Sequence, residues 1–217
     1  LWSQSLPPID INHYYYNCND CFESDFNGKS DGGINLLDNQ SKKWEGIFIS
    51  PIHPEVNSYL FTIISDIIHN YKIHGIHFNY LRYQDSFYGY NNKGIEDFFV
   101  IYSFNPKDLN RGLISTRFGY SESEVDSLNY LWDNYRTNKI TELVRSVKYK
   151  IITDSLNIKL SALVKPNYIE SKNRWHQDWM SWIDENIIDF VIIENFDIDD
   201  KFIYNNKFIA NNVSNYT

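Results

Sequence analysis

A strand, a helix and a second strand follow one another between residues 46 and 83, and this order constrains the fold most. Gly46–Ser50 is a short apolar run that Pro51 closes. Val56–Tyr71 repeats apolar side chains at spacings of three and four, which predicts a helix with one apolar face. Ile73–Tyr83 begins like a strand that is buried on both faces. A strand–helix–strand unit with short links predicts parallel strands and a right-handed crossover.

The same alternation continues toward the C-terminus. An apolar stripe from Leu128 to Ile151 predicts a second long helix, and Ile158–Val164 and Asp189–Glu194 predict two more strands. This order is typical of α/β folds with a parallel sheet. No Gly-x-Gly-x-x-Gly follows a strand, whereas long irregular stretches do. We therefore predict a (β/α)8 TIM-type barrel instead of a doubly wound sheet.

The length of 217 residues and the 42% hydrophobic content suffice for one domain with a sizeable core. We expect residues 1–217 to form a single, incomplete barrel domain, with the front strands and the closing strand outside this sequence. Residues 12–43 and 84–127 are polar or aperiodic, so we expect two long loops there. The remaining expectations are a loop at Tyr168–Arg174, a short helix at Gln177–Glu185 and the start of a strand at Phe208–Ala210.

Composition excludes two classes of partner. A net charge of -8 and the lack of any Lys/Arg block argue against nucleic acid. No apolar run reaches about 18 residues, so we expect no membrane span. The 17 Tyr, 14 Phe and 6 Trp would suit stacking against sugar rings, although an aromatic core with AT-biased codon usage is the simpler explanation.

Cys18 and Cys21 form an isolated Cys-x-x-Cys in a stretch rich in Asn and Asp. Without a second pair this is a weak zinc or redox signal, and two ordinary loop cysteines, or a local disulfide in an exported protein, are the favoured interpretations. No His-x-x-x-His spacing supplies further ligands, so we expect no metal and no cofactor.

Polar side chains crowd the end of the strand that begins at Ile73. We assign His77, Asn79, Arg82 and Tyr83 to substrate binding, because the carboxyl ends of strands carry the chemistry in barrels. Alternation places His77 and Asn79 on one face, where His77 could equally be a core histidine with a satisfied hydrogen bond. The Arg82 guanidinium can hold a carboxylate or a pair of sugar hydroxyls, or can orient a neighbouring carboxylate.

Three carboxylates are candidates for catalysis. Glu194 ends a predicted strand directly before Asn195, which we assign to substrate binding; a cap or a loop ion pair would explain Glu194 equally well. Asp178 opens a short helix, where stabilising the helix N-terminus is the simpler role. Asp85 lies in a polar loop, where a solvent-exposed surface position is the simpler explanation. Stacking platforms for sugars are assigned to four aromatic residues, for each of which packing is the simpler explanation: Trp2, Tyr83, Tyr90 and Trp175.

Four blocks of the chain resemble a known family. Ser50–Val56, the helix and Tyr71–Tyr83 are similar to the His-Pro-Glu-Val and Asp-Gly-Ile-His-Phe-Asp-Tyr signature of the glycosyl-hydrolase-like family 10. Phe87–Asn91, Trp132–Arg136 and Gln177–Trp182 resemble later blocks of that family in the same order. The resemblance implies a bacterial, exported barrel, found in the periplasm, as a lipoprotein or outside the cell, that acts on a polysaccharide or cell-wall glycan.

The chain departs from the family at His74 and Asn79, where the family has Asp. The second position would be a leading catalytic or substrate-binding candidate, and Asn can serve neither as nucleophile nor as base. Two hypotheses follow. The chain is a glycoside hydrolase that uses a pair of carboxyl groups, with Glu194 as one of them, or it is a degenerate barrel that binds glycan without cleaving it.

Overall fold

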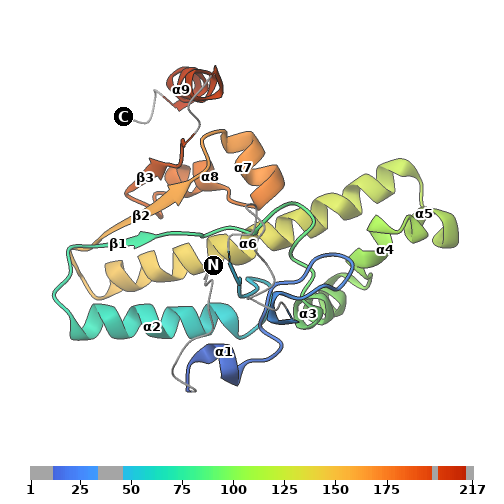
Figure 1. Cartoon of the computed structure of the whole chain (residues 1–217), viewed down its shortest axis with the longest axis horizontal. Helices are drawn as coiled ribbons and strands as arrows, with labels where there is room; N and C mark the ends of the chain where they lie inside the picture. The colour runs from blue at the N-terminus through green and yellow to red at the C-terminus, as the bar shows by residue number, and fades with distance from the viewer. Residues whose placement is uncertain (1–11, 34–45, 197–199, 214–217) are drawn as a thin grey trace.

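The chain folds into a mixed α/β structure with a small parallel sheet (Figure 1). The computed structural model describes residues 12–33, 46–196 and 200–213. Its strands are β1 (Gly75–Phe78), β2 (Lys159–Val164) and β3 (Phe190–Ile193), in the order β1-β2-β3. The register pairs Gly75 with Lys159, and Ser161 with Phe190. The strands predicted near these positions are therefore confirmed, and the described residues show three parallel strands without a closed barrel.

Helices connect and flank the strands. They are α1 (Tyr14–Asn17), α2 (Val56–Asn70), α3 (Asn92–Tyr102), α4 (Pro106–Asn110), α5 (Leu113–Phe118), α6 (Glu122–Thr153), α7 (Tyr168–Trp175), α8 (Trp179–Asp184) and α9 (Asp200–Val213), with a 3-10 turn at Asp31–Gly33. Helices α2 and α6 run side by side on one side of the sheet, and α9 lies far from α1 (Figure 1). The two long predicted helices are confirmed as α2 and α6. None of the described helices combines the length and the apolar character that crossing a membrane requires.

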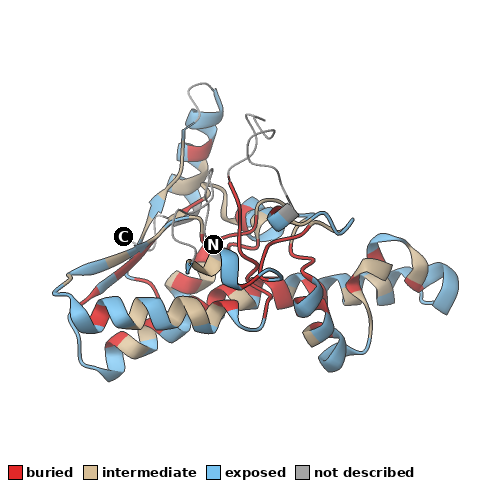
Figure 2. Cartoon of the chain, turned by 60° about the horizontal axis from the view of Figure 1, so that its bottom comes forward, coloured by how far each residue is buried: buried red, intermediate tan, exposed pale blue. Residues whose placement is uncertain are grey.

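The core lies between one face of the sheet and the helices, and buried positions concentrate at the centre of the molecule (Figure 2). Strand β2 contributes Leu160, Ala162 and Val164, all fully buried. Trp179 and Trp182, three residues apart on α8, are equally buried. The predicted short helix therefore exists because both indoles enter the core from one side.

The opposite face of the sheet is open in the described residues. Gly75 and His77 on β1 are exposed, and on β3 Phe190 and Ile192 are 50% and 46% exposed. We expected strands buried on both faces, and this expectation is wrong for β1 and β3. The alternation of burial along β1 matches the predicted division of faces, with Ile76 on the covered side.

Several expected loops and strands prove to be different elements. Residues 84–127 contain α3, α4, α5 and the start of α6 instead of a long loop. The expected loop Tyr168–Arg174 is helix α7, and the expected strand Phe208–Ala210 lies within α9. Gly46–Ser50 is no strand: it contributes one antiparallel bridge, between Ile49 and Phe22. Residues 12–33 hold α1, the 3-10 turn and isolated bridges, while residues 34–43 and Trp2 lie outside the described residues.

Three of the missed helices, α3, α4 and α7, share a physical cause, because an Asn side chain caps the start of each. The Asn91 side chain accepts from the Gly94 amide (3.2 Å) at the start of α3. Asn105 accepts from the Lys107 amide (2.9 Å) at α4, and Asn167 accepts from two amides at α7. An Asn side chain that satisfies the free amides of a first turn can start a helix too short to show an apolar period.

Candidate functional site

The carboxyl ends of β2 and β3 open into a pocket of about 250 Å³, called here the strand-end pocket. It is lined by residues from the exits of β2 and β3 and from helices α7 and α9: Lys165, Pro166, Asn167, Glu170, Arg174, Trp175, Glu194, Phe196, Lys201 and Asn205. Three residues that the sequence analysis singled out lie here or next to it, namely Glu194, Trp175 and Asn195.

Glu194 forms an ion pair across the two strand ends. Lys165 Nζ donates to Glu194 Oε1 over 2.7 Å, and the two side chains are only 16% and 19% exposed. The same ammonium lies 5.2 Å from the centre of the Trp175 ring. Sequence reasoning missed Lys165, although it directly follows β2 just as Glu194 directly follows β3. The strand-end signal that selected Glu194 would have found it.

A second charged pair ties the loop after β1 to α7. Arg174 donates hydrogen bonds to both carboxylate oxygens of Asp85. Its Nε lies 3.1 Å from Oδ1 and 3.0 Å from Oδ2, and its Nη2 lies 2.7 Å from Oδ2. Partial burial opposes ionisation of Asp85, but the hydrogen bonds from Arg174 and from the Ser86 amide outweigh it and lower its pKa. The Arg174 guanidinium also lies 4.7 Å from the Trp175 ring. Asp85 is therefore held as an anion that links the loop after β1 to α7.

Asp178 stands apart from these pairs. It occupies the N-cap position of α8 without a side-chain capping bond. Its carboxylate lies 2.7 Å from Lys172 Nζ. All three predicted carboxylates thus carry a cationic partner.

The end of β1 has a different character, because its polar groups bond to neighbouring strand and backbone atoms. The Nδ1 of exposed His77 lies 2.9 Å from Ser161 Oγ on β2. Asn79 Oδ1 accepts from the amide of Tyr80 over 2.8 Å, and Tyr80 takes a left-handed φ of 55°. Asn79 therefore shapes the exit of the strand.

Three predicted binding residues are packed in the interior. Arg82 is buried, and its Nη1 donates to the carbonyl of Tyr83 over 3.1 Å. Tyr83 is fully buried, and its hydroxyl donates to the carbonyl of Arg136 over 3.2 Å. Tyr90, also buried, packs on Trp132. Of the predicted stacking residues that the structure describes, Trp175 is the one that lines the strand-end pocket.

Asn195 connects β3 to α9. Its side-chain oxygen accepts from Asn205 Nδ2 over 3.1 Å, and its Nδ2 donates to Asn206 Oδ1 over 3.2 Å. It therefore positions one wall of the strand-end pocket, to which Asn205 belongs.

Gln177 fastens the base of the same region. Its buried amide donates to the carbonyls of Leu81 (3.3 Å) and Leu163 (3.1 Å), and accepts from the Lys165 amide (2.9 Å) and Ser171 Oγ (3.1 Å). One neutral side chain thus joins the exits of β1 and β2 to α7. From the sequence, we placed Gln177 at the start of the expected short helix and gave it no role in the site.

Two buried carboxylates lie in the N-terminal segment that was expected to be a loop. Glu23 is fully buried, and its Oε1 accepts from the amides of Ser24 (2.9 Å) and Gly89 (3.1 Å). Asp31 accepts from the Phe48 amide (2.9 Å) and from the Gln84 side chain. Burial raises the pKa of each carboxyl to about 7, against the hydrogen bonds that favour ionisation.

Comparison with known families settles the relationship. A family model described as Glycosyl hydrolase-like 10 matches residues 26–198. The chain belongs to the glycosyl hydrolase-like 10 family. The matched region of this family includes all three strands and the strand-end residues Lys165, Trp175 and Glu194, and it excludes Cys18 and Glu23. No curated protein matches the chain. Membership in the glycosyl hydrolase-like 10 family confirms the resemblance and points to a carbohydrate ligand.

Proposed function

We propose that the strand-end pocket binds an oligosaccharide segment of a polysaccharide or cell-wall glycan. The observation that carries this proposal is the partly buried indole of Trp175, which lies against Lys165 and Arg174 in a pocket that also contains Glu194. A sugar ring presents C–H groups to an aromatic face and hydroxyls at its edge. An indole bordered by charged hydrogen-bonding groups complements both.

We further propose that Glu194 supplies one carboxylate for hydrolysis. Bonded to the Lys165 ammonium as a carboxylate, it is suited to attack the anomeric carbon or to activate water. Glu170, which lines the same pocket, is the candidate for the second carboxyl group, and to act as a proton donor it would have to leave its pair with Arg174 (3.3 Å). A hydrolase needs that second group to protonate the departing oxygen.

Binding without cleavage is the alternative, and two observations favour it. Asn79 stands at the end of β1, where the resemblance to the family implies a carboxylate, and its side chain bonds to the backbone. Glu194, Asp178 and Asp85 each contact a cation. A glycosidase that has lost its proton donor could retain its glycan pocket.

The test compares hydrolysis and binding in the same preparations. Purified protein is assayed against cell-wall glycan and a polysaccharide panel, with product release and calorimetric binding measured for the parent, Glu194→Gln and Trp175→Ala. Glu185→Gln is the matched control, because Glu185 is an exposed carboxylate that pairs with Arg145 (2.6 Å). A hydrolase predicts loss of turnover with retained binding in Glu194→Gln, and binding weakened by about ten-fold in Trp175→Ala.

The other outcomes are equally informative. A parent that binds but releases no product, and gains turnover in Asn79→Asp, establishes the non-catalytic alternative. If no glycan in the panel binds, or if Trp175→Ala binds as tightly as the parent, the pocket is not the glycan site.

We also propose that the strands belong to a (β/α)8 architecture. The parallel order, the polar strand ends and the open apolar face of β3 support this arrangement, because the inward-facing side chains of barrel strands normally meet other barrel strands. Export of the protein is part of the same proposal, and the Cys18–Cys21 disulfide suits an oxidising compartment.

A further inference from the structure

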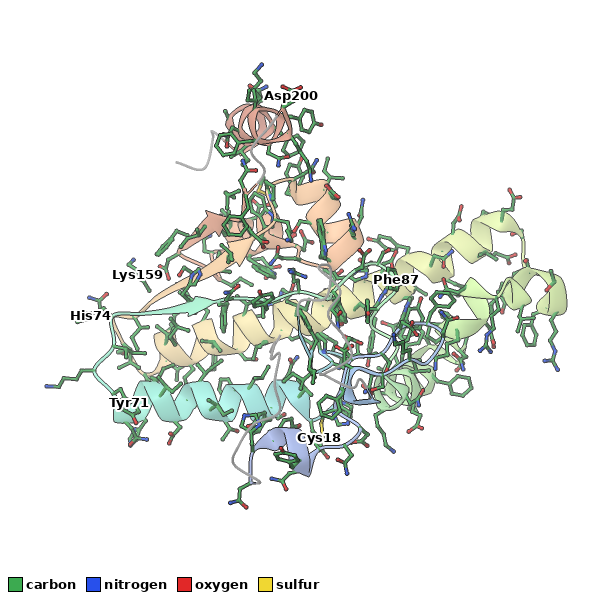
Figure 3. All side chains as sticks on the ribbon, viewed as in Figure 1. Cys18, Tyr71, His74, Phe87, Lys159 and Asp200 are labelled. Carbon is green, nitrogen blue, oxygen red and sulfur yellow. A yellow bond between two sulfur atoms is a disulfide. The ribbon has the colours of Figure 1, made fainter. Side chains whose placement is uncertain are left out.

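A cluster of four potential metal ligands lies away from the strand-end pocket. Cys18, Asp20 and Cys21 follow α1, and His53 belongs to the turn that precedes α2. Figure 3 shows Cys18 beside the sulfur–sulfur bond, between α1 and the beginning of α2. One ligand atom from each of the four side chains lies within 4.8 Å of the others. From the sequence, we expected no metal because Cys-x-x-Cys stood alone; Asp20 lies between the two cysteines, and the fold brings His53 to them.

Two of the separations match the edges of a tetrahedron around zinc, both of them from Asp20. Zinc–sulfur, zinc–nitrogen and zinc–oxygen bonds of about 2.3, 2.0 and 2.1 Å place neighbouring ligand atoms about 3.3–3.8 Å apart. Asp20 Oδ1 lies 3.5 Å from Cys18 Sγ and 3.6 Å from His53 Nε2. The Cys21 sulfur lies 3.7 and 4.0 Å from the two nitrogens of His53. To complete the tetrahedron, the two sulfurs must separate and the Cys21 sulfur must move closer to Nε2 of His53.

Most of the four candidate ligands are buried, as the ligands of structural metal sites are, and a hydrogen-bond donor lies beside one of the sulfurs. Cys18, Cys21 and His53 are buried, whereas the Asp20 side chain is 60% exposed and leaves a path for an ion to enter. The Tyr14 hydroxyl lies 2.9 Å from the Cys21 sulfur, where it can donate to a thiolate.

His53 must change its hydrogen bonding when an ion enters. Its Nδ1 accepts from the amide of Glu55 (3.2 Å), so Nε2, which faces Asp20, is the nitrogen that we assign to the metal. When a metal binds Nε2, the ring proton moves to Nδ1. The backbone amide of exposed Glu55 then loses its hydrogen bond to Nδ1 and donates to water instead.

We propose that Cys18, Asp20, Cys21 and His53 form a redox-dependent zinc site, which binds Zn²⁺ when the Cys18–Cys21 disulfide is reduced. A dithiol supplies the electrons: one of its sulfurs bonds to a cysteine sulfur as the disulfide breaks, and its second sulfur displaces that cysteine. The protein keeps two thiols and the reductant leaves as a cyclic disulfide. Zn²⁺ then replaces the two thiol protons, which pass to solvent, with no further electron transfer.

The zinc-bound state links the segment after α1 to the turn before α2 through His53, whereas the disulfide joins two residues within that segment. The two states exclude each other. Sulfurs that are bonded together cannot act as thiolate ligands. The site thus holds a local disulfide under oxidising conditions, and a metal link to His53 under reducing ones. It does not depend on the proposed glycan function.

The test uses the full chain in both redox states. Protein reduced with a dithiol and desalted under argon is titrated with Zn²⁺ against a chromophoric chelator, and Co²⁺ is used to detect thiolate charge-transfer and tetrahedral d–d absorption. We expect one equivalent of Zn²⁺ in the reduced protein and none in the oxidised protein. Cys21→Ser should lose the intensity of the charge-transfer band.

Asp20→Asn keeps the test decisive if a buried substitution prevents folding, because Asp20 is exposed. We expect it to weaken Zn²⁺ binding by about ten-fold or more, whereas Asp66→Asn, an exposed carboxylate on α2, should leave the affinity unchanged. The proposal is overturned if the reduced parent binds no Zn²⁺, or if Asp20→Asn and Cys21→Ser bind it as tightly as the parent.

Discussion

Glu23 lies fully buried with one carboxylate oxygen bonded to two amides, and its other oxygen, Oε2, has no hydrogen-bond partner among the described residues. Burial of a carboxylate without a cation disfavours its charged form. The pKa of this carboxyl rises from its ordinary value of 4.5 to about 7 in the fold. The folded state therefore holds a proton over a pH range in which the unfolded chain has released it.

We predict that Glu23 makes the protein less stable as pH rises from about 5 to 8. The contribution of the protonated group is complete below the unfolded pKa of 4.5 and is lost as pH passes the folded value of about 7. The loss is on the order of 3 kcal/mol. Urea unfolding of the parent and of Glu23→Gln at several pH values measures it, and the neutral amide should remove that part of the slope.

Buried His176 makes the unfolding free energy rise with pH, opposite to the effect of Glu23. The slope of the parent must therefore be compared with that of Glu23→Gln. Burial lowers the pKa of His176 well below 6.5, so its contribution to stability is present above the unfolded pKa of 6.5 and is lost as pH falls. Glu96→Gln, an exposed carboxylate that pairs with Lys93 (3.4 Å), is the matched control and should keep the slope of the parent. An unchanged slope in Glu23→Gln would show that Glu23 is not the group responsible.

Gly94 illustrates how the elements pack, because helix α3 approaches the turn before α2 through this residue. A Cβ built at Gly94 would overlap the Ile52 side chain, which is fully buried. The absence of a side chain at Gly94 allows the close approach, since the residue lies within a regular helix.

We predict that Gly94→Ala destabilises the protein by about 1–3 kcal/mol through overpacking, although alanine is the better helix former by about 1 kcal/mol. Lys93→Ala, at an exposed position of the same helix, is the control and should change the unfolding free energy by less than about 0.5 kcal/mol. In an Ile52→Ala background the cost of Gly94→Ala should shrink. Stabilisation by Gly94→Ala in the parent would contradict the packing.

Elements with a strong local pattern were predictable, and those fixed by caps or distant contacts were not. Helix α2 repeats its apolar positions at helical spacing over fifteen residues, so the sequence alone predicts it. Helix α3 ends in five consecutive apolar or aromatic residues, Phe98–Tyr102, which hide the period. Helix α7 is eight residues long and mostly polar, and its start depends on Asn167.

The candidate site divides in the same way. Glu194 was selected because a charged residue directly follows an apolar strand, and that rule would have found Lys165 too. Glu23 and His53 gave no such signal, because their surroundings come from far along the chain: the Gly89 amide in one case and Cys21 in the other. A single sequence gives no pattern for contacts between segments that lie so far apart along the chain.

Stability should be distributed unevenly over the whole molecule. Strand β2 is paired on both sides and contributes fully buried residues, as does the C-terminal half of α6. Helix α9 is exposed over most of its described side chains, with Asn205 as its buried contact. Segments with few buried contacts open with smaller free energies than the core.

We therefore predict that the amides of β2 and of α6 residues 140–151 exchange with deuterium most slowly, and that α9 exchanges at least about ten-fold faster. Peptide-resolved mass spectrometry measures this, with unfolded protein as the reference for intrinsic rates. Protection of α9 equal to that of β2 would mean that this helix is held by contacts beyond those described.

The two ways in which the strand ends are fastened respond differently to the solvent. Gln177 joins them with an uncharged, buried amide, which dissolved ions do not screen. The grip of Arg174 on Asp85 is partly exposed, with the arginine side chain 47% accessible, so added salt weakens it. Raising the ionic strength should thus weaken this one attachment, while the hydrogen bond from the Tyr83 amide to the Trp175 carbonyl (3.0 Å) still holds the loop after β1 to α7. The charged wall of the pocket at Arg174 is therefore sensitive to ionic strength, and the uncharged base at Gln177 is not.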